Sequence, residues 1–283
     1  MFKIYAILWH ICFPKKKRRY RRKTEMLLAI DVGNSNIVFG ISQNDKWMGT
    51  FRLTTTENRT SDEIGLMILQ FFRCFEFNPN EVEDVIIASV VPPVMHTLKK
   101  AIVKYIGKEP LIVDEDIFPS IQYEGEDHLG ADRSVCCEAA IAKYGKPLIV
   151  LDLGTATTID AINEDGWYLG GSILAGLQIT TDALFYKASK LPRIDLKKPS
   201  TVLGCNTIEQ IQAGSVCGYI GCIEHLLRET KREMGYGDDV KVIATGGLAQ
   251  LMNDHTNMFD IVDNDLIMDG LRVIYQNYKN NLN

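Results

Sequence analysis

From Met26 onward, runs of hydrophobic residues separated by polar turns divide the chain into a strand-rich stretch and a helical stretch, and the same order starts again near Leu148. In the first half, short apolar runs with Gly, Asn and Asp between them predict a meander of three strands. Thr60 and Glu63 have the spacing of a capping box, which predicts the start of a helix. We expect strands over residues 27–31, 37–42, 47–53, 84–90 and 111–114, and helices over 64–72 and 94–106.

The second half repeats the motifs of the first. One apolar strand ends in Asp31-Val-Gly33, another ends in Asp152-Leu-Gly154, and a second strand follows each of them. This pattern predicts an internal duplication, although two short strand-turn-strand units can also resemble each other by chance. Two similar halves commonly enclose a ligand between them. We expect strands over residues 148–152, 157–163, 167–171 and 242–245, and helices over 133–143, 177–191 and 208–231.

Length and charge limit the kinds of protein that the sequence can be. A chain of 283 residues predicts two domains, which we place at residues 26–145 and 146–283. Residues 1–25 hold nine Lys or Arg and one acid, so the rest of the chain carries 22 basic and 35 acidic residues. An acidic body argues against broad nucleic-acid binding and favours small substrates. Seven cysteines without a CxxC pair argue against a disulfide framework or a zinc site and predict reduced, buried thiols.

Residues 1–25 form a basic leader that we expect to be disordered or to come from a mis-assigned start, because Met26 opens the first predicted strand directly. The apolar part, residues 1–13, is only about half as long as a membrane span, and its charges follow the apolar run instead of preceding it. A short amphipathic membrane anchor and a basic nucleic-acid arm are the alternatives. We expect neither a membrane nor a nucleic acid as a partner.

Three glycine-containing turns carry the candidate chemistry. In an Asp-x-Gly turn, the glycine lets the backbone approach phosphate oxygens, and the aspartate can bind a cation that neutralises phosphate charge. A single Asp-x-Gly is also typical of an ordinary hairpin, but Asp31 and Asp152 each follow an apolar strand. A third turn, Gly246-Gly247, permits close approach of an adenosine, with a tight turn that binds nothing as its structural alternative.

These three turns, in this order in a duplicated chain, resemble the phosphate-1, phosphate-2 and adenosine motifs of the actin, Hsp70 and sugar-kinase superfamily. Further motifs look like those of type III pantothenate kinases, and the match runs from Met26 to near Tyr278. The matching segments are residues 31–40, 89–92, 129–133, 152–160 and 170–173. The resemblance implies an α/β fold of two duplicated actin-like, ribonuclease H-like domains with a ligand cleft between them.

The resemblance also implies an activity, which is ATP-dependent phosphorylation of pantothenate to 4'-phosphopantothenate, the first step of coenzyme A biosynthesis. It implies K⁺ or NH₄⁺ bound by Asp152, and Mg²⁺ with ATP bound by Asp31 directly or through water. Residue type alone does not choose between the two metals, because a hard carboxylate oxygen suits either. The expected assembly is a cytoplasmic homodimer with its active site near the interface.

Site residues follow from the same resemblance. Asp132 is expected to be the general base for the pantothenate hydroxyl and Arg133 to hold the substrate; phosphoryl transfer needs mainly an oriented proton acceptor, which a carboxylate provides. ATP is expected to contact Asp31, Val32, Gly33, Asn34, Ser35, Asn36, Ile37, Val38 and Thr155. Pantothenate is expected to contact Asn34, Tyr123, Gly130, Ala131, Asp132, Arg133 and, from the neighbouring subunit, Thr207.

The same residues have structural alternatives. Asp132 could cap the helix over 133–143 with Arg133 in a surface ion pair, and Thr207 could cap the helix over 208–231. Two departures from the family pattern affect the loops around the substrate. Glu124-Gly125 stand where the family commonly has Asn-Pro, and Ala175-Gly176 stand where it has Pro-Gly, so a fixed backbone torsion is lost at each place.

Three rival functions remain open from the sequence. A sugar or glycerol kinase of the same superfamily would keep the phosphate turns but would not require the Gly130–Arg133 motif. A Bvg accessory factor-like regulator that binds partners or DNA would be expected to lose its carboxylates, yet Asp31, Asp132 and Asp152 are all present. An actin- or Hsp70-like ATPase would lack room here for its usual subdomain insertions.

Overall fold

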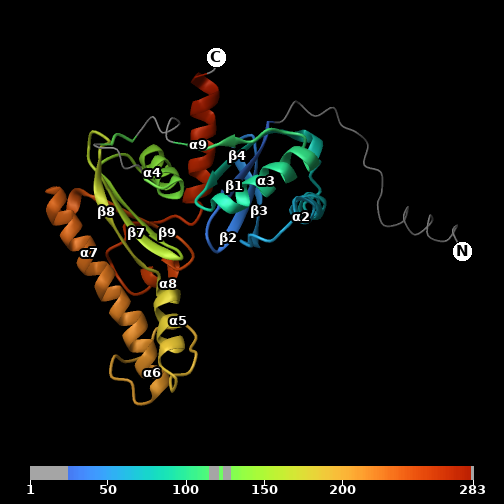
Figure 1. Ribbon diagram of the computed structural model, residues 1–283. Helices are drawn as coiled ribbons and strands as arrows, with labels where there is room; N and C mark the ends of the chain where they lie inside the picture. The colour runs from blue at the N-terminus through green and yellow to red at the C-terminus, as the bar shows by residue number, and fades with distance from the viewer. Residues whose placement is uncertain (1–24, 115–120, 124–128, 282–283) are drawn as a thin grey trace, which may run out of the picture.

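The computed structural model describes residues 25–114, 121–123 and 129–281. The predicted leader, apart from its last residue, and the departure at Glu124-Gly125 lie outside the described residues. Figure 1 shows two sheets side by side, with helices between them and over their outer faces. The α/β class predicted from the motifs is therefore confirmed.

The first sheet is a meander extended by two parallel strands. β1 pairs with β2 and β2 with β3 in antiparallel fashion, whereas β4 and then β5 follow in parallel on the other side of β1. The strand order is β3-β2-β1-β4-β5. The strands are β1 (Met26–Val32), β2 (Asn36–Gln43), β3 (Lys46–Thr54), β4 (Val82–Ser89) and β5 (Leu111–Ile112).

The second sheet repeats this topology. β6, β7 and β8 form the antiparallel meander, and β9 and β10 extend it in parallel from β6. Its order, β10-β9-β6-β7-β8, is that of the first sheet listed from the opposite edge, so the predicted duplication is confirmed. The strands are β6 (Leu148–Leu153), β7 (Ala156–Ile162), β8 (Tyr168–Ala175), β9 (Lys241–Thr245) and β10 (Ile261–Val262).

Helices cover both faces of each sheet. Those of the first half and the end of the chain are α2 (Ser61–Cys74), α3 (Pro92–Tyr105), α4 (Ala131–Tyr144) and α9 (Leu266–Asn281). Those of the second half are α5 (Leu177–Lys187), α6 (Thr207–Gln212), α7 (Gly218–Met234) and α8 (Ala249–Asn253). α2 and α3 cover the outer face of the first sheet, α7 and α8 cover the outer face of the second, and α4 and α9 lie between the sheets.

β1 is buried on both faces, because successive side chains of a strand point to opposite sides. Leu28 and Ile30 pack with α2 and α3, whereas Leu27 and Ala29 pack with α4 and α9. α4 also contributes buried residues to the core of the second sheet. α9 follows the second sheet in sequence but packs on the first, and the boundary at 145/146 stays a prediction.

Local sequence patterns predicted most of the helices and strands correctly. At α2, the Thr60 hydroxyl accepts the Glu63 N–H at 3.2 Å and the Glu63 carboxylate accepts the Thr60 N–H at 2.7 Å, which confirms the capping box. The helix expected over 208–231 is confirmed, since the backbone is helical without a break from residue 207 to 234. Within this run, a π-helical turn, Ala213–Cys217, lies between α6 and α7 and was not predicted. Gly214 lies in this turn, and glycine favours a helix weakly.

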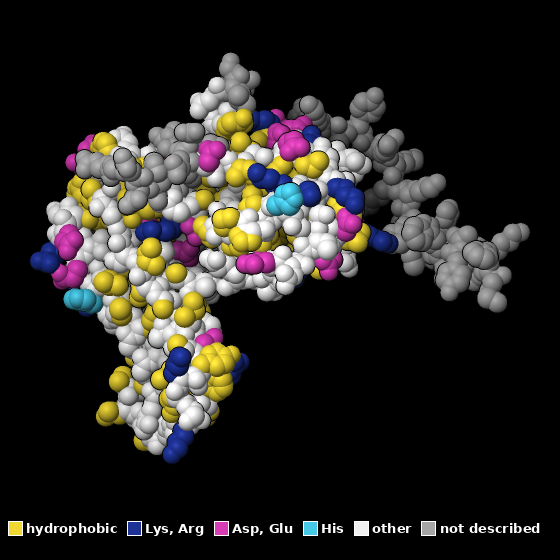
Figure 2. Space-filling view, viewed as in Figure 1, with side chains coloured by type: hydrophobic (Ala, Val, Ile, Leu, Met, Phe, Trp, Pro, Cys, Tyr) yellow, Lys and Arg dark blue, Asp and Glu magenta, His cyan; other side chains and the backbone are white. Residues whose placement is uncertain are grey.

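α5, α6 and residues 188–206 between them form a projection below the second sheet (Figure 1). Hydrophobic side chains gather on its surface in Figure 2, and Tyr186, Val202 and Leu203 are 68%, 70% and 84% exposed. The helix expected over 177–191 is shorter than predicted, since α5 ends at Lys187. Within the described ranges, no helix is both long and apolar enough to cross a membrane.

Candidate active site

The two duplicated turns place one aspartate in each half of the molecule. Asp31 lies near the end of β1 and Asp152 at the corresponding position of β6, and both are partly buried. The turns have the same hydrogen bond, from the Gly33 N–H to the Asn36 carbonyl at 3.0 Å and from the Gly154 N–H to the Ala156 carbonyl at 3.2 Å. The sequence repeat is therefore a repeat of turn geometry as well.

Burial and nearby negative charges raise the pKa of both turn aspartates. Burial raises the pKa of Asp31 to about 7, and the negative charges of Asp132 and Asp152 add to this rise. Burial also raises the pKa of Asp152 to about 7, with further contributions from Asp132 and Asp160. We call Asp31, Asp132 and Asp152 the carboxylate cluster; in the described part of the chain, no Lys or Arg forms an ion pair with any of them.

The carboxylate cluster fits cations that bring ligands of their own. Among the described residues, no group of three His, Cys, Asp or Glu side chains is arranged to hold a metal ion. A cation here would therefore complete its shell with water or phosphate oxygens, as Mg²⁺ commonly does. The uncompensated charge of Asp31 and Asp152 and their hard oxygen donors match such an ion.

The three predicted nucleotide turns come together. The Ser35 and Thr155 hydroxyls, one from each duplicated turn, lie 2.7 Å apart in a hydrogen bond. Gly246 has a φ of +93°, and a Cβ added there would lie 2.5 Å from Asp152 Oδ1 and 2.6 Å from the Leu153 carbonyl carbon. The third turn therefore lies against the second, and only a glycine allows this approach.

Exposure divides the predicted ATP contacts into two groups. Asn34, Ser35, Asn36 and Thr155 are exposed and can present their side chains to a ligand. Val32, Ile37 and Val38 belong to or pack against the hydrophobic cores, so in this structure they could contact ATP only through the backbone.

The start of α4 carries Asp132 and Arg133. Gly130 is the N-cap, which excludes the alternative in which Asp132 caps the helix. Asp132 Oδ1 instead accepts the Arg133 N–H at 2.8 Å. The Arg133 guanidinium donates from Nε to Asp160 Oδ2 at 3.2 Å and from Nη2 to Asp160 Oδ1 at 2.5 Å. The alternative of a surface ion pair is also wrong, because the Asp160 side chain is only 1% exposed.

Two tyrosines join this pair to the predicted substrate contacts. Arg133 Nη2 donates to the Tyr168 hydroxyl at 3.1 Å, and the rings of Tyr123 and Tyr168 have centroids 5.9 Å apart. The Tyr123 hydroxyl is 3.0 Å from the hydroxyl of Ser134, which follows Arg133 in α4. The sequence did not predict Asp160, Tyr168 or Ser134 as site residues, although Asp160 is the last residue of the matching segment 152–160.

Thr207 lies apart from the other predicted site residues within one chain. It is the first residue of α6, and Asn206 is the N-cap, so the capping alternative for Thr207 is wrong by one residue. It lines a cavity of about 540 Å³ in the projection together with Thr180, Leu191 and Gly214. In Figure 1, α6 lies at the far end of the projection, and α4 lies at the opposite end of the molecule.

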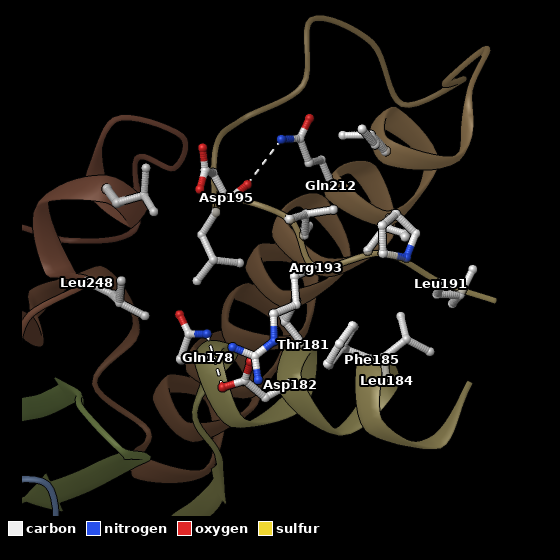
Figure 3. Close-up of a pocket in the computed structure, with 16 residues that line it drawn as sticks. Gln178, Thr181, Asp182, Leu184, Phe185, Leu191, Arg193, Asp195, Gln212 and Leu248 are labelled. Carbon is white, nitrogen blue, oxygen red and sulfur yellow. Dashed lines mark hydrogen bonds between the residues drawn. The ribbon is translucent and has the colours of Figure 1, made fainter. Parts of the chain in front are cut away.

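A second cavity, of about 690 Å³, lies between α5, α6 and α8. Figure 3 shows Gln178, Asp182 and Arg193 pointing into it, with the Gln178 amide donating to Asp182 at 3.1 Å. Leu248, which directly follows the Gly246-Gly247 turn, closes it from the side of α8. This cavity therefore begins where the predicted adenosine turn ends.

The duplicated sheets and the three turns define the class, which is the actin-like nucleotide-binding fold. The sequence model of the type III pantothenate kinase family matches residues 27–229, and the chain belongs to this family. Family membership supports a kinase that uses ATP.

Similar solved structures agree on the fold. A Campylobacter jejuni protein described as a conserved Baf-family transcriptional activator is 23% identical, with a TM-score of 0.55 over 89% of this chain and 99% of that one. MreB5 of Spiroplasma citri bound to ADP is 12% identical, with a TM-score of 0.50 over 92% and 99% of the two chains. A Sinorhizobium meliloti protein provisionally described as a 2-dehydro-3-deoxygalactonokinase is 11% identical, with a TM-score of 0.50 over 88% and 96%.

Proposed function

We propose that this protein transfers the γ-phosphoryl group of ATP to the hydroxyl of pantothenate, giving 4'-phosphopantothenate and ADP. The observation that carries the proposal is the start of α4. There the carboxylate of Asp132 accepts the backbone N–H of Arg133, and the Arg133 guanidinium bonds to Asp160. The negative charge of Asp132 also contributes to the raised pKa of both turn aspartates. Membership in the type III pantothenate kinase family supports the same substrate.

The proposed roles follow from the chemistry of these groups. Asp132 accepts the proton of the pantothenate hydroxyl as the new bond to phosphorus forms, since this reaction depends mainly on an oriented acceptor. Arg133 binds the pantothenate carboxylate, and Tyr123, Asn34, Gly130 and Ala131 shape the surrounding pocket. Ser35 and Thr155 contact the phosphates of ATP, and the adenosine extends from the Gly246-Gly247 turn toward the 690 Å³ cavity.

Two cations belong to the proposal. Asp31 would hold Mg²⁺ with ATP, directly or through water, and Asp152 would bind K⁺ or NH₄⁺. When bound, the cations neutralise charge on the phosphates and on the two turn aspartates. The raised pKa values of Asp31 and Asp152, about 7 in each case, support this assignment. Burial and then neighbouring carboxylates disfavour the charged form of each group, and a bound cation would offset both effects.

We also propose a homodimer that works in the cytoplasm. Thr207 can contact pantothenate only if a second copy brings its projection to the site, because α6 lies far from α4 in the same chain. The exposed Tyr186, Val202 and Leu203 of the projection support an interface there, since large exposed apolar patches commonly mark contact surfaces. Among the described cysteines only Cys136 and Cys137 are buried, so the expectation of buried thiols is wrong for the exposed Cys74, Cys205 and Cys222.

A regulator without catalytic activity is the second candidate, because the Baf-family protein from Campylobacter jejuni is 23% identical over nearly its whole length. One experiment separates the candidates. The purified protein is incubated with ATP, Mg²⁺, K⁺ and pantothenate, with glucose, glucosamine and glycerol as parallel acceptors. Phosphorylation of pantothenate alone supports the proposal, phosphorylation of a sugar or glycerol supports a different kinase, and no turnover with any acceptor supports the regulator.

A further inference from the structure

Arg133 is held along one edge of its guanidinium group. Nε and Nη2 donate to the two oxygens of Asp160 at 3.2 and 2.5 Å, and Nη2 also donates to the Tyr168 hydroxyl at 3.1 Å. A planar guanidinium bound to a carboxylate through two parallel hydrogen bonds keeps a fixed direction. We call Asp160 and Tyr168, with their hydrogen bonds to Arg133, the arginine clamp.

The arginine clamp stands on a rigid part of the fold. Asp160 lies in β7, which pairs with β6 on one side and β8 on the other, and Tyr168 opens β8. Gly171, opposite Asp160 in β8, leaves the space that the guanidinium occupies. A Cβ added there would lie 3.1 Å from Arg133 Nη2 and 3.0 Å from the Tyr168 hydroxyl.

The other edge of the guanidinium is left for a ligand. Arg133 Nη1 makes no hydrogen bond to any described residue, although an arginine offers donors on Nη1 as well. Because Asp160 already neutralises the positive charge, the site would attract an anion mainly through the fixed direction of these donors. The backbone N–H of Arg133 donates separately to the Asp132 carboxylate in the first turn of α4.

We propose that Asp160 and Tyr168 are positioning residues for the substrate carboxylate: they hold Arg133 by its Nε–Nη2 edge so that Nη1 is presented to the substrate. This inference rests on the proposed function, in which Arg133 binds the carboxylate of pantothenate. A buried ion pair with only a structural role would hold α4 against β7 but would not affect the recognition of one substrate group.

The test compares two substrates in the full-length protein and in Asp160→Asn. The variant keeps the size of the side chain but removes its charge and one acceptor. We expect the KM for pantothenate to rise by roughly 10-fold or more, since charge-assisted hydrogen bonds are the strong ones. The KM for ATP should stay within about twofold, because the clamp does not touch the nucleotide turns. The KM for pantothenol, which has an alcohol in place of the carboxylate, should rise much less in the variant.

A matched control and a milder variant complete the test. Asp263→Asn also weakens an ion pair of an aspartate, the partly exposed one with Lys143, and should leave the KM for pantothenate unchanged. Tyr168→Phe removes one hydrogen bond and should raise the KM for pantothenate by roughly 2- to 5-fold. If Asp160→Asn does not fold, Tyr168→Phe decides the matter alone.

Each outcome counts for or against the inference. Unchanged KM for pantothenate in folded variants, or equal losses with pantothenate and pantothenol, would overturn the positioning role while leaving the proposed function intact. Absence of pantothenate phosphorylation by the unmodified protein would instead overturn the proposed function, together with the carboxylate assigned to Arg133. A selective rise in KM for pantothenate supports both.

Discussion

Two regions of the molecule contain buried or partly buried acidic side chains, and they differ in whether a basic residue compensates the negative charge. In the carboxylate cluster, Asp31 and Asp152 have no basic partner among the described residues, and burial raises the pKa of each to about 7. Between α4 and α9, Asp263 and Asp269 both accept hydrogen bonds from Lys143 at 2.5 Å. Although burial alone would raise it, the hydrogen bonds from Lys143 and Tyr144 lower the pKa of Asp263.

The acidic groups beside α4 and α9 stabilise the fold, whereas we propose that those of the carboxylate cluster bind ligands. Asp269 also accepts from Trp47 Nε1 and from Arg272, each at 2.8 Å, and so ties β3, α4 and α9 together. We call Lys143, Asp263, Asp269, Arg272 and Trp47 the interhelix network. Its charges are paired within the protein, whereas we propose that cations from solution compensate those of the carboxylate cluster.

The largest expected effect is the loss of turnover in Asp132→Asn. The amide cannot accept the substrate proton, so kcat should fall by roughly 10²- to 10⁴-fold. ATP binding and the melting temperature should change little, because Asp132 has no ion pair to lose among the described residues. Asp165→Asn, in an exposed turn, is the matched control. Near-normal kcat in Asp132→Asn would end the assignment of the base.

The choice of monovalent cation should have the next largest effect. With K⁺ replaced by Na⁺ at constant ionic strength, turnover should fall sharply, and NH₄⁺, which is similar in size to K⁺, should restore it. Simple screening would affect the three salts alike, so the comparison isolates a bound ion. Asp152→Asn should lower turnover and reduce the difference between K⁺ and Na⁺. Equal rates of the unmodified protein in both salts would remove the monovalent site from Asp152.

The interhelix network should show the reverse pattern, with stability lost and chemistry kept. Asp269→Ala removes the acceptor of three charged or polar donors in a buried setting, and we expect the free energy of unfolding in urea to fall by about 2–4 kcal/mol. kcat should stay near its normal value at a temperature where the variant is folded. The control is Asp62→Ala, an ion pair with Lys104 at 2.7 Å on the surface, which should leave the melting temperature nearly unchanged. Similar losses in both variants would contradict the comparison.

The sequence predicted the turn aspartates of the carboxylate cluster but not the contacts of the interhelix network. Asp31 and Asp152 could be found because each sits in a local turn whose residues are adjacent in the chain. The capping box at Thr60 was predictable for the same reason. The contacts of Asp269 with Lys143 and Trp47 join residues that are 126 and 222 positions apart, so no local pattern carries them.

The arginine clamp could not be predicted from local sequence patterns for the same physical reason. Arg133 and Asp160 are 27 residues apart and meet only because α4 packs over β7. The π-helical turn after α6 also escaped prediction, because the apolar spacing on both sides of it is helical. For Thr207, the environment depends on whether a second copy is present, which the pattern of one chain does not specify.

A pH series should separate the two acidic regions by the sign of their effect on stability. Asp31 and Asp152 have folded-state pKa values of about 7, above the ordinary 3.8, so their contribution is present below about pH 4 and is lost as pH rises through 7. Asp263 has a lowered pKa, so its contribution is present above its ordinary pKa and is lost as pH falls through the lowered value.

In EDTA without nucleotide, the free energy of unfolding should therefore fall by about 1–3 kcal/mol between pH 6 and pH 8. Asp31→Asn should flatten this slope, and saturating Mg²⁺ with K⁺ should flatten it for the unmodified protein. Asp263→Asn should lower stability at both pH values without changing the slope. A steeper loss in Asp31→Asn than in the unmodified protein would show that another group titrates.

The smallest effect is expected at the hydrogen bond between the two duplicated turns. Ser35 Oγ and Thr155 Oγ1 are 2.7 Å apart but exposed, so water can replace either partner, and Ser35→Ala should leave the melting temperature nearly unchanged. The KM for ATP should rise by only about 2- to 5-fold, because the lost phosphate contact is partly offset by freeing the Thr155 hydroxyl. Thr155→Ser keeps a hydroxyl and should behave as the unmodified protein, whereas Thr155→Ala should behave as Ser35→Ala. If both alanine variants keep the normal KM for ATP, the two hydroxyls do not contact the nucleotide, and only the backbone of the turns remains to bind its phosphates.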